Sequence, residues 1–166
     1  MDSYKTYKED FTIRLADRSD AALIVHYIRE LAKFEGELHE VTATKETLET
    51  YMFDKGGAEA LIGEFENQPV GFAFFHMTFS TFLGKPGIAL VDLYIEPEMR
   101  NRGYGATMLK RLAQITKERD CERLEWWVHD WNHDAVRFYK SYGAEMVKEI
   151  RIYRLASNSL DAFAEG

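Results

Sequence analysis

Apolar residues recur along the chain with two different periods, and these periods separate expected strands from expected helices. Short runs rich in β-branched and aromatic residues are typical of strands. They lie at residues 11–16, 59–65, 69–79, 87–95, 123–130 and 145–155. The tripeptide ENQ at 66–68 separates two of these runs. Its position predicts an antiparallel hairpin.

Helical spacing of apolar residues appears in four other segments, at 17–35, 44–53, 105–119 and 132–143. Asp17 or Ser19 can cap the first helix, and Thr44 can cap the second. Each of the two longer helices has an apolar stripe that we expect to face the core. The stripes are Ile24, Tyr27, Ile28, Leu31 and Phe34 in the first, and Met108, Leu109, Leu112, Ile115 and Thr116 in the third.

The elements follow the order β-α-α-β-β-β-α-β-α-β, which combines a strand meander with two strand–helix–strand units. This order predicts a mixed sheet with helices on both faces, in the α/β (α+β) class. No Pro-, Gly- or Ser-rich linker and no repeat divides the chain, so residues 1–166 are expected to form a single domain.

Composition limits the kinds of partner. A hydrophobic content of 46% is enough for a sizeable core, and a net charge of −7 argues against nucleic-acid binding and mildly favours a cationic small partner. The most apolar run is too short for a membrane span, and the first twenty residues contain no apolar signal core. With one cysteine, Cys121, no internal disulfide can form. We expect a cytoplasmic protein that does not bind membranes.

The segment EPEMRNRGYGAT (96–107) joins an expected strand to an expected helix and holds Arg100, Arg102, Gly103 and Gly105. Free backbone N–H groups at a helix start attract phosphate, and glycines allow the backbone to approach it. The alternative is an ordinary helix start with solvated arginines. A dinucleotide fingerprint is excluded because Met108 stands where a third glycine is required, and no Gly-Lys-Ser/Thr of a nucleotide loop follows.

Three motifs, in this order along the chain, resemble the GNAT N-acetyltransferase superfamily. IRELAKFE (28–35) is similar to the first helix of the spermidine/spermine and thialysine acetyltransferases within it. Arg100-x-x-Gly103-x-Gly105-Ala106 resembles the family's acyl-CoA pyrophosphate loop, and WNHDAVRFYKSYGAEMV (131–147) its later motif. The resemblance implies a mostly antiparallel central sheet with splayed central strands, and acetyl-CoA as co-substrate.

The resemblance also implies which residues bind the coenzyme. The pantetheine arm would bond to backbone groups of the strand at 88–95 and lie near Asn132, and a backbone N–H near Tyr94 would stabilise the thioester oxygen. The residues expected to bind acetyl-CoA are Leu93, Tyr94, Ile95, Arg100, Asn101, Arg102, Gly103, Tyr104, Gly105, Ala106, Thr107, Asn132, His133, Asp134 and Ala135.

Tyr139 matches the family tyrosine near the thioester sulfur, and proton donation to the departing thiolate suits its chemistry. The base is open. Where related enzymes have a Glu-Asp pair, this chain has Val91-Asp92. Glu35, Glu125 and a water relay are the alternatives, and regular alternation would point Asp92 to the face opposite Val91.

Phe34, Trp127 and Phe82 are candidate walls for the alkyl part of a substrate, beside the acids Glu35, Asp92 and Glu125. Ser80 replaces a family acid, which makes a long polycation a weaker expectation than a smaller or amino-acid-like amine. Core packing and solvated charge are the alternative roles for these residues.

The resulting hypothesis is acetyl transfer from acetyl-CoA to a primary amine of a small molecule, by direct attack in a ternary complex. No metal is expected, because His129 and His133 span a strand end and a helix start. The resemblance implies a homodimer. The alternatives are a protein or peptide amine acetyltransferase of the same fold and a non-catalytic CoA-binding module.

Overall fold

The structure, a computed structural model, describes residues 3–5 and 10–166. The chain divides into two compact units, Met1–Trp127 and Val128–Gly166. The first holds the sheet and helices α1 to α3, and the second holds α4 and α5. None of the helices in the described part of the chain combines the length and apolarity that a membrane span needs.

The sheet of the first unit has the strand order β1-β2-β3-β4-β5-β6. The strands are β1 (Ser3–Lys5), β2 (Phe11–Leu15), β3 (Glu59–Phe65), β4 (Gln68–Ser80), β5 (Lys85–Ile95) and β6 (Arg123–Trp126). Neighbours are antiparallel except β5 and β6, which are parallel. The expected hairpin joins β3 to β4 through Glu66 and Asn67, whose φ angles are 50° and 65°. The mixed, mostly antiparallel sheet is therefore confirmed.

Helices α1 (Ala21–Glu35) and α2 (Lys45–Leu48) precede β3, and the chain continues from α2 into a π-helix, Glu49–Asp54. Short 3₁₀ helices lie at Arg18–Asp20, Leu38–Glu40 and Pro97–Met99. Asp17 and Thr44 are both caps, with side chains that accept from Ser19 N and Thr47 N at 2.8 and 3.2 Å.

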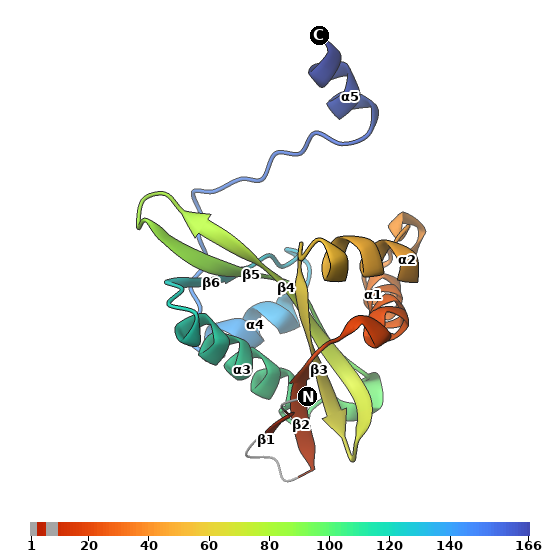
Figure 1. Cartoon of the computed structure of the whole chain (residues 1–166). Helices are drawn as coiled ribbons and strands as arrows, with labels where there is room; N and C mark the ends of the chain where they lie inside the picture. The colour runs from red at the N-terminus through yellow and green to blue at the C-terminus, as the bar shows by residue number, and fades with distance from the viewer. Residues whose placement is uncertain (1–2, 6–9) are drawn as a thin grey trace. The chain divides into compact units, whose positions relative to one another are not determined.

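Helix α3 (Tyr104–Glu118) lies on the face of the sheet opposite α1 and α2 (Figure 1). Its predicted stripe is buried, with Met108 and Leu112 fully so. On β3, Gly63 lets this helix approach, because a Cβ at Gly63 would lie 2.7 Å from Phe11 Cζ and 3.0 Å from Met108 Sδ. The helices on both faces are thus confirmed.

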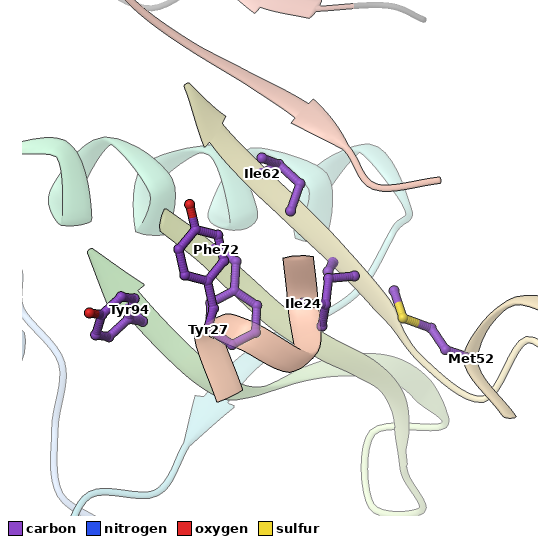
Figure 2. Close-up of a cluster of buried hydrophobic side chains, with 7 residues drawn as sticks. Ile24, Tyr27, Met52, Ile62, Phe72 and Tyr94 are labelled. Atoms are coloured by element: carbon purple, nitrogen blue, oxygen red, sulfur yellow. The ribbon is translucent and has the colours of Figure 1, made fainter. Parts of the chain in front are cut away.

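A cluster of buried side chains fills the space between the sheet and α1 (Figure 2). Tyr27 from α1 stacks on Phe72 of β4 at 5.5 Å between ring centroids and packs beside Tyr94 of β5 at 5.7 Å. Ile62 of β3 belongs to this cluster, whereas its neighbour Gly63 faces α3. Adjacent strand residues therefore face different helices, as the pleat requires.

The central strands separate toward the end of β5. Strand β6 pairs with Gly87–Leu90 only, although β5 continues to Ile95. Among the described strands, none pairs with residues 91–95 of β5 on that side. The backbone groups along that edge have no strand partner among the described residues, and the expected splay is confirmed.

The strand expected at 145–155 is wrong. Within the described residues this segment joins no ladder, and Ile150, Ile152 and Tyr153 are 69%, 62% and 91% exposed. Apolar alternation supplies strand propensity, but backbone N–H and C=O groups form a strand only against a partner. The second unit instead contains α4 (His133–Ser141) and an unpredicted helix, α5 (Asn158–Glu165).

Candidate active site

The turn before α3 presents uncapped backbone donors. Gly103 is the N-cap residue with φ 82°, and no side chain of the described residues caps the helix. The positive end of the helix dipole adds to these N–H groups. A Cβ built on Gly105 would meet only Ile95 Cγ1, at 3.9 Å, so this glycine is not required by packing inside the chain. The turn fits a bound phosphate group.

The two arginines of this turn have different surroundings. Arg100 donates from Nε to the Ile95 carbonyl at 2.8 Å, and its guanidinium lies 5.5 and 5.4 Å from the ring centroids of Phe34 and Tyr94. Arg100 therefore ties the turn to β5 and to the end of α1. Arg102 is exposed and lies 5.7 Å from the Phe65 ring, which leaves it better placed to reach an anion from solvent.

Several other residues of the turn build the helix start itself. Tyr104 is buried and stacks on Phe11 at 4.2 Å, and Thr107 Oγ1 donates to the Gly103 carbonyl at 3.0 Å. Asn101 is exposed with φ 60°, and Ala106 is half-buried. The side chains of Tyr104 and Thr107 shape the turn, so any contact with a ligand would come from their backbone.

Residues 93–95 carry this turn on the splayed end of β5. Tyr94 and Ile95 are buried and Leu93 is half-buried, which fixes the backbone of the segment that has no pairing with β6. Burial raises the pKa of the Tyr94 hydroxyl. The predicted pantetheine strand and the predicted phosphate turn are thus continuous in the structure.

A pair of carboxylates lies on the α1 face of the same strand. Asp92 is half-buried, and burial together with the charge of Glu35 raises its pKa to about 6. Glu35 is the last residue of α1 and is half-buried, while the neighbouring Phe34 is 53% exposed. The structure therefore brings together Phe34, Glu35 and Asp92, three of the predicted substrate residues.

The remaining substrate candidates of the first unit lie elsewhere along the strands. Glu125 of β6 pairs in register with Ala89, three residues before Asp92, and lines a cavity of about 70 Å³ with Thr78, Ser80 and Arg123. Phe82, in the connection between β4 and β5, is 96% exposed, and Trp127 is 59% exposed.

The second unit contains the later motif. Asn132 Oδ1 accepts from Ala135 N at 3.1 Å and so caps α4, whose first turn holds His133 and Asp134. The side-chain oxygen of Asn132, a residue expected near the pantetheine, is therefore already hydrogen-bonded to the start of α4. Burial raises the pKa of the Tyr139 hydroxyl to about 12, so this group keeps its proton at neutral pH.

One feature of the site has no local sequence pattern. Val91 is an extra residue in β5, because Phe74 pairs with Asp92 and the next residue, Phe75, pairs with Leu90. Such a bulge re-aims the side chains that follow it. The apolar run GIALVDLYI gives no sign of where an extra residue will fall.

Known proteins resemble this chain over most of its length. Residues 25–144 match the family described as "Acetyltransferase (GNAT) family". A mouse thialysine N-epsilon-acetyltransferase is 33% identical over 146 residues, covering 82% of this chain and 85% of the relative. The human spermidine/spermine N(1)-acetyltransferase-like protein 1 is 33% identical over 148 residues, covering 84% of this chain and 21% of that protein. Among solved structures, an integron cassette protein from the mobile metagenome of V. cholerae has a TM-score of 0.80 and 25% identity, with 95% of this chain and 99% of that one covered.

Proposed function

This chain belongs to the GNAT acetyltransferase family and is an N-acetyltransferase, and we propose that it transfers acetyl from acetyl-CoA to a primary amine of a small molecule. The acceptor is a polyamine, a diamine or an amino-acid-like amine. The amine attacks the thioester directly in a ternary complex.

One observation carries this proposal: the edge of β5 that no described strand pairs with runs between the uncapped start of α3 and a pair of carboxylates. The uncapped start of α3 lies at one end of this path, and Asp92 with Glu35 lies beside it on the α1 face. A coenzyme with phosphates at one end and an acyl group at the other suits such a path. Two carboxylates suit an ammonium group.

The residues that hold the coenzyme divide into three groups. Backbone N–H groups of residues 103–106 and the exposed Arg102 bind the phosphates, and backbone groups of residues 91–95 bind the pantetheine arm. Acetyl-CoA, when bound, supplies the acetyl thioester. Residues Asn132 to Ala135 of the second unit remain candidates by their place in the motif.

Tyr139 is the proposed proton donor to the leaving thiolate. A phenol whose pKa is about 12 stays protonated at neutral pH, and it can still donate to a thiolate that would otherwise depart as a charged group. The role rests on the position of Tyr139 in the motif 131–147.

The acceptor is proposed to be short. The names of the mouse and human relatives point to thialysine and to spermidine or spermine. In this chain Val91 and Ser80 occupy positions where acids would extend a site for a polycation. Glu35 and Asp92 remain as one pair of neighbouring carboxylates. An amino-acid-like amine with a single distal ammonium therefore suits the site better than spermine.

The proposal is tested with acetyl-CoA and a panel of amines. Acetyl-CoA should raise the thermal midpoint, and thiol release should follow addition of thialysine, lysine, ornithine, diamines or spermidine, with the amino-acid-like amines giving the higher kcat/KM. Without any thermal shift from acetyl-CoA, the coenzyme assignment is lost. A shift without turnover on any small amine, followed by turnover on a peptide amine, would replace the small acceptor by a peptide.

Tyr139→Phe has a matched control in Tyr142→Phe, since Tyr142 ends the same helix and is 62% exposed. We expect the Tyr139 variant to lose on the order of 100-fold in kcat, a typical contribution of acid catalysis. The thermal shift with acetyl-CoA should persist, and Tyr142→Phe should match wild type. Equal activity of the two variants would remove Tyr139 from the mechanism.

A homodimer accompanies this proposal, by resemblance to the same group of enzymes.

A further inference from the structure

A small polar pocket is formed by β4, β5 and β6 near the hairpin that joins β4 to β5. Its cavity measures about 70 Å³, and one water needs about 10–15 Å³ of such space. The pocket therefore has room for a polar group larger than a single water. The residues that line it include Thr78, Ser80, Gly87, Arg123 and Glu125.

This pocket lies on the same face of the sheet as Asp92. Residues directly opposite each other on paired strands point to the same face, and faces alternate along a strand. Phe74, the partner of Asp92, packs on the core cluster beneath α1, so Thr78, four residues further along β4, points to this face as well. Gly87 pairs with both Thr78 and Arg123, which places these three residues at one level.

Gly87 forms the floor of the pocket because it has no side chain. A Cβ built there would lie 2.8 Å from Thr78 Oγ1 and 3.6 Å from Arg123 Cβ. Arg123 and Glu125 are both exposed, and they lie two residues apart on β6, on the same face. A guanidinium and a carboxylate therefore lie side by side at the pocket, both accessible to solvent.

The polar groups of the pocket have unused hydrogen-bonding capacity. Within the described part of the chain, Arg123 and Glu125 make no hydrogen bond or ion pair, either with each other or with a third residue. Thr78 Oγ1 has no partner among the same residues. Ser80 Oγ accepts from Leu83 N at 3.4 Å, which leaves its own O–H to donate.

A second cation near the pocket is already paired. Lys85, opposite Ser80 in the ladder, lies 3.2 Å from Asp120 Oδ1 and 3.5 Å from Glu122 Oε2. Arg123 is therefore the cation of this pocket that is left to bind an anion from solution.

The chemistry of the pocket suits a group that carries both charges. A guanidinium binds a carboxylate through two parallel N–H donors, and hydroxyl groups add further donors. A carboxylate beside it binds an ammonium group. A carboxylate and an ammonium group on one carbon atom are the head group of an α-amino acid.

We propose that this pocket binds the head group of an amino-acid acceptor, with Arg123 on its α-carboxylate and Glu125 on its α-ammonium. The inference rests on the proposed function, and it names the acceptor as a free diamino acid that is acetylated on its distal amine. The hydroxyls of Thr78 and Ser80 donate to the same α-carboxylate. The distal amine lies toward Asp92, at the pair of carboxylates already described.

The spacing along β5 fits such an acceptor. Glu125 is level with Ala89, and Asp92 follows three residues later, a distance of about 10 Å at about 3.3 Å per residue. The side chains of Glu125 and Asp92 cover part of this distance, and the alkyl chain of the acceptor spans the rest. A simple diamine has no carboxylate for Arg123, so it would bind with one charged contact fewer.

The first test compares each diamino acid with the diamine that lacks only its carboxylate: lysine with cadaverine, and ornithine with putrescine. Arg123→Gln should lower kcat/KM for lysine and ornithine at least about tenfold, the order of a lost charge-assisted hydrogen bond. Its kcat/KM for the two diamines should stay as in wild type. Arg123→Lys keeps the charge without the fork and should recover part of the loss. Arg29→Gln, the same change at an exposed position of α1, should act as wild type on all four amines.

The second test compares lysine with Nα-acetyl-lysine, in which the α-nitrogen carries no charge. Glu125→Gln should lower kcat/KM for lysine at least about tenfold and leave Nα-acetyl-lysine unchanged. Glu66→Gln, at the exposed turn between β3 and β4, is the matched control. The thermal midpoint and the thermal shift with acetyl-CoA should match wild type in every variant, which reports that each is folded.

Two results would overturn the pocket assignment. An Arg123→Gln variant that loses the same factor on lysine and on cadaverine would show that the guanidinium does not bind the carboxylate. An Arg123→Gln variant as active as wild type on lysine would show the same.

The outcomes also separate this inference from the function on which it rests. A wild-type protein that acetylates diamines in preference to diamino acids refutes the head-group pocket and leaves the proposed function standing. A wild-type protein that acetylates no small amine refutes both.

Discussion

At the scale of single residues, two glycines at the start of α3 serve different purposes. Gly103 has a φ of 82°, a left-handed conformation, whereas Gly105 lies in the first helical turn with no close neighbour within the chain. Left-handed backbone costs other residues about 1–2 kcal/mol. The first glycine is therefore required by the fold, and the second leaves room for the phosphate approach that we propose.

We predict that Gly105→Val leaves the free energy of unfolding within about 1 kcal/mol of wild type, since valine is at least as good a helix former as glycine. The same variant should lose the thermal shift with acetyl-CoA, because its side chain stands where the phosphates approach. Urea denaturation and thermal shift measure the two effects. Normal acetyl-CoA binding by Gly105→Val would move the phosphate site away from this turn.

Gly103→Ala should destabilise the fold by about 1–2 kcal/mol through its backbone conformation. Gly84→Ala is the matched control, because Gly84 has a φ of 63° and open space around it in the connection between β4 and β5. Both variants should lose similar stability in urea, and only Gly103→Ala should also weaken acetyl-CoA binding. Equal binding by both would make Gly103 purely a turn residue.

Asp92 should also govern the pH dependence of stability. Its pKa rises from 3.8 to about 6 on folding, so between these pH values the folded chain holds a proton that the unfolded chain has lost. The stabilising contribution of the protonated form is complete below pH 3.8 and is lost as pH rises through about 6.

Asp92→Asn should therefore be more stable than wild type at pH 8 by up to about 3 kcal/mol, at about 1.4 kcal/mol per pKa unit. The difference should vanish near pH 4. Urea denaturation at pH 4, 6 and 8 measures it, with Asp10→Asn as the same substitution at an exposed position. A difference that grows toward low pH has the wrong sign and would contradict the raised pKa.

At the scale of elements, α3 is attached to the sheet by its apolar stripe and by a bidentate ion pair. Leu112 is fully buried, and Arg119 after the helix donates to both Glu59 oxygens of β3 at 2.5 and 2.6 Å. Because α3 carries the glycine turn at its start, packing along the helix holds in place the turn that we propose as the phosphate site.

Leu112→Ala should reduce the free energy of unfolding by about 2–5 kcal/mol, the usual range for a buried leucine. Lys117→Ala, on the exposed side of the same helix, should stay within about 0.5 kcal/mol of wild type. Denaturant unfolding compares the two. Equal losses of unfolding free energy in the two variants would mean that the apolar stripe is not what holds α3 on the sheet.

Element types along most of the chain could be predicted from periodicity, because a strand or helix that buries one face needs apolar residues at its own period. The stripes at Ile24 and Tyr27 and at Met108 and Leu112 are buried as expected. The segment 145–155 has the same kind of pattern and no ladder. Local propensity was right only where a partner strand completed the backbone hydrogen bonds.

At the scale of the whole molecule, the proposed homodimer and the exposed apolar residues of 145–155 bear on the same measurement. Ile150, Ile152 and Tyr153 expose large apolar side chains. Apolar side chains that are exposed together often mark a surface that contacts another protein. Sedimentation should give a mass twice that of the 166-residue chain. Ile152→Lys should shift the equilibrium toward monomer, and Lys148→Ala should not. A monomeric wild-type protein at micromolar concentration would contradict the proposed homodimer.

The turn that we propose for the coenzyme phosphates could be located in the sequence, because its local structure depends on the order of residues along the chain. A strand, two arginines, two glycines and a helix follow each other directly, so the uncapped helix start can be anticipated from residues 87–119 alone. Even there, the structure separates Arg100, which binds the Ile95 carbonyl, from the exposed Arg102. That difference depends on Phe34 and Tyr94, which only folding brings to Arg100.

The amine end of the candidate site could not be predicted from the sequence, because the position of its carboxylates depends on the tertiary structure. The sequence by itself determined that Val91 replaces an acid and that Asp92 remains. Regular alternation along the strand gave no reason to expect Asp92 beside Glu35. Pairing of β4 with β5 inserted Val91 as a bulge, turned Asp92 toward α1 and placed it beside Glu35, 57 positions earlier in the chain. The register of two strands is set by packing on both faces of the sheet at once, and no short stretch of sequence contains that information.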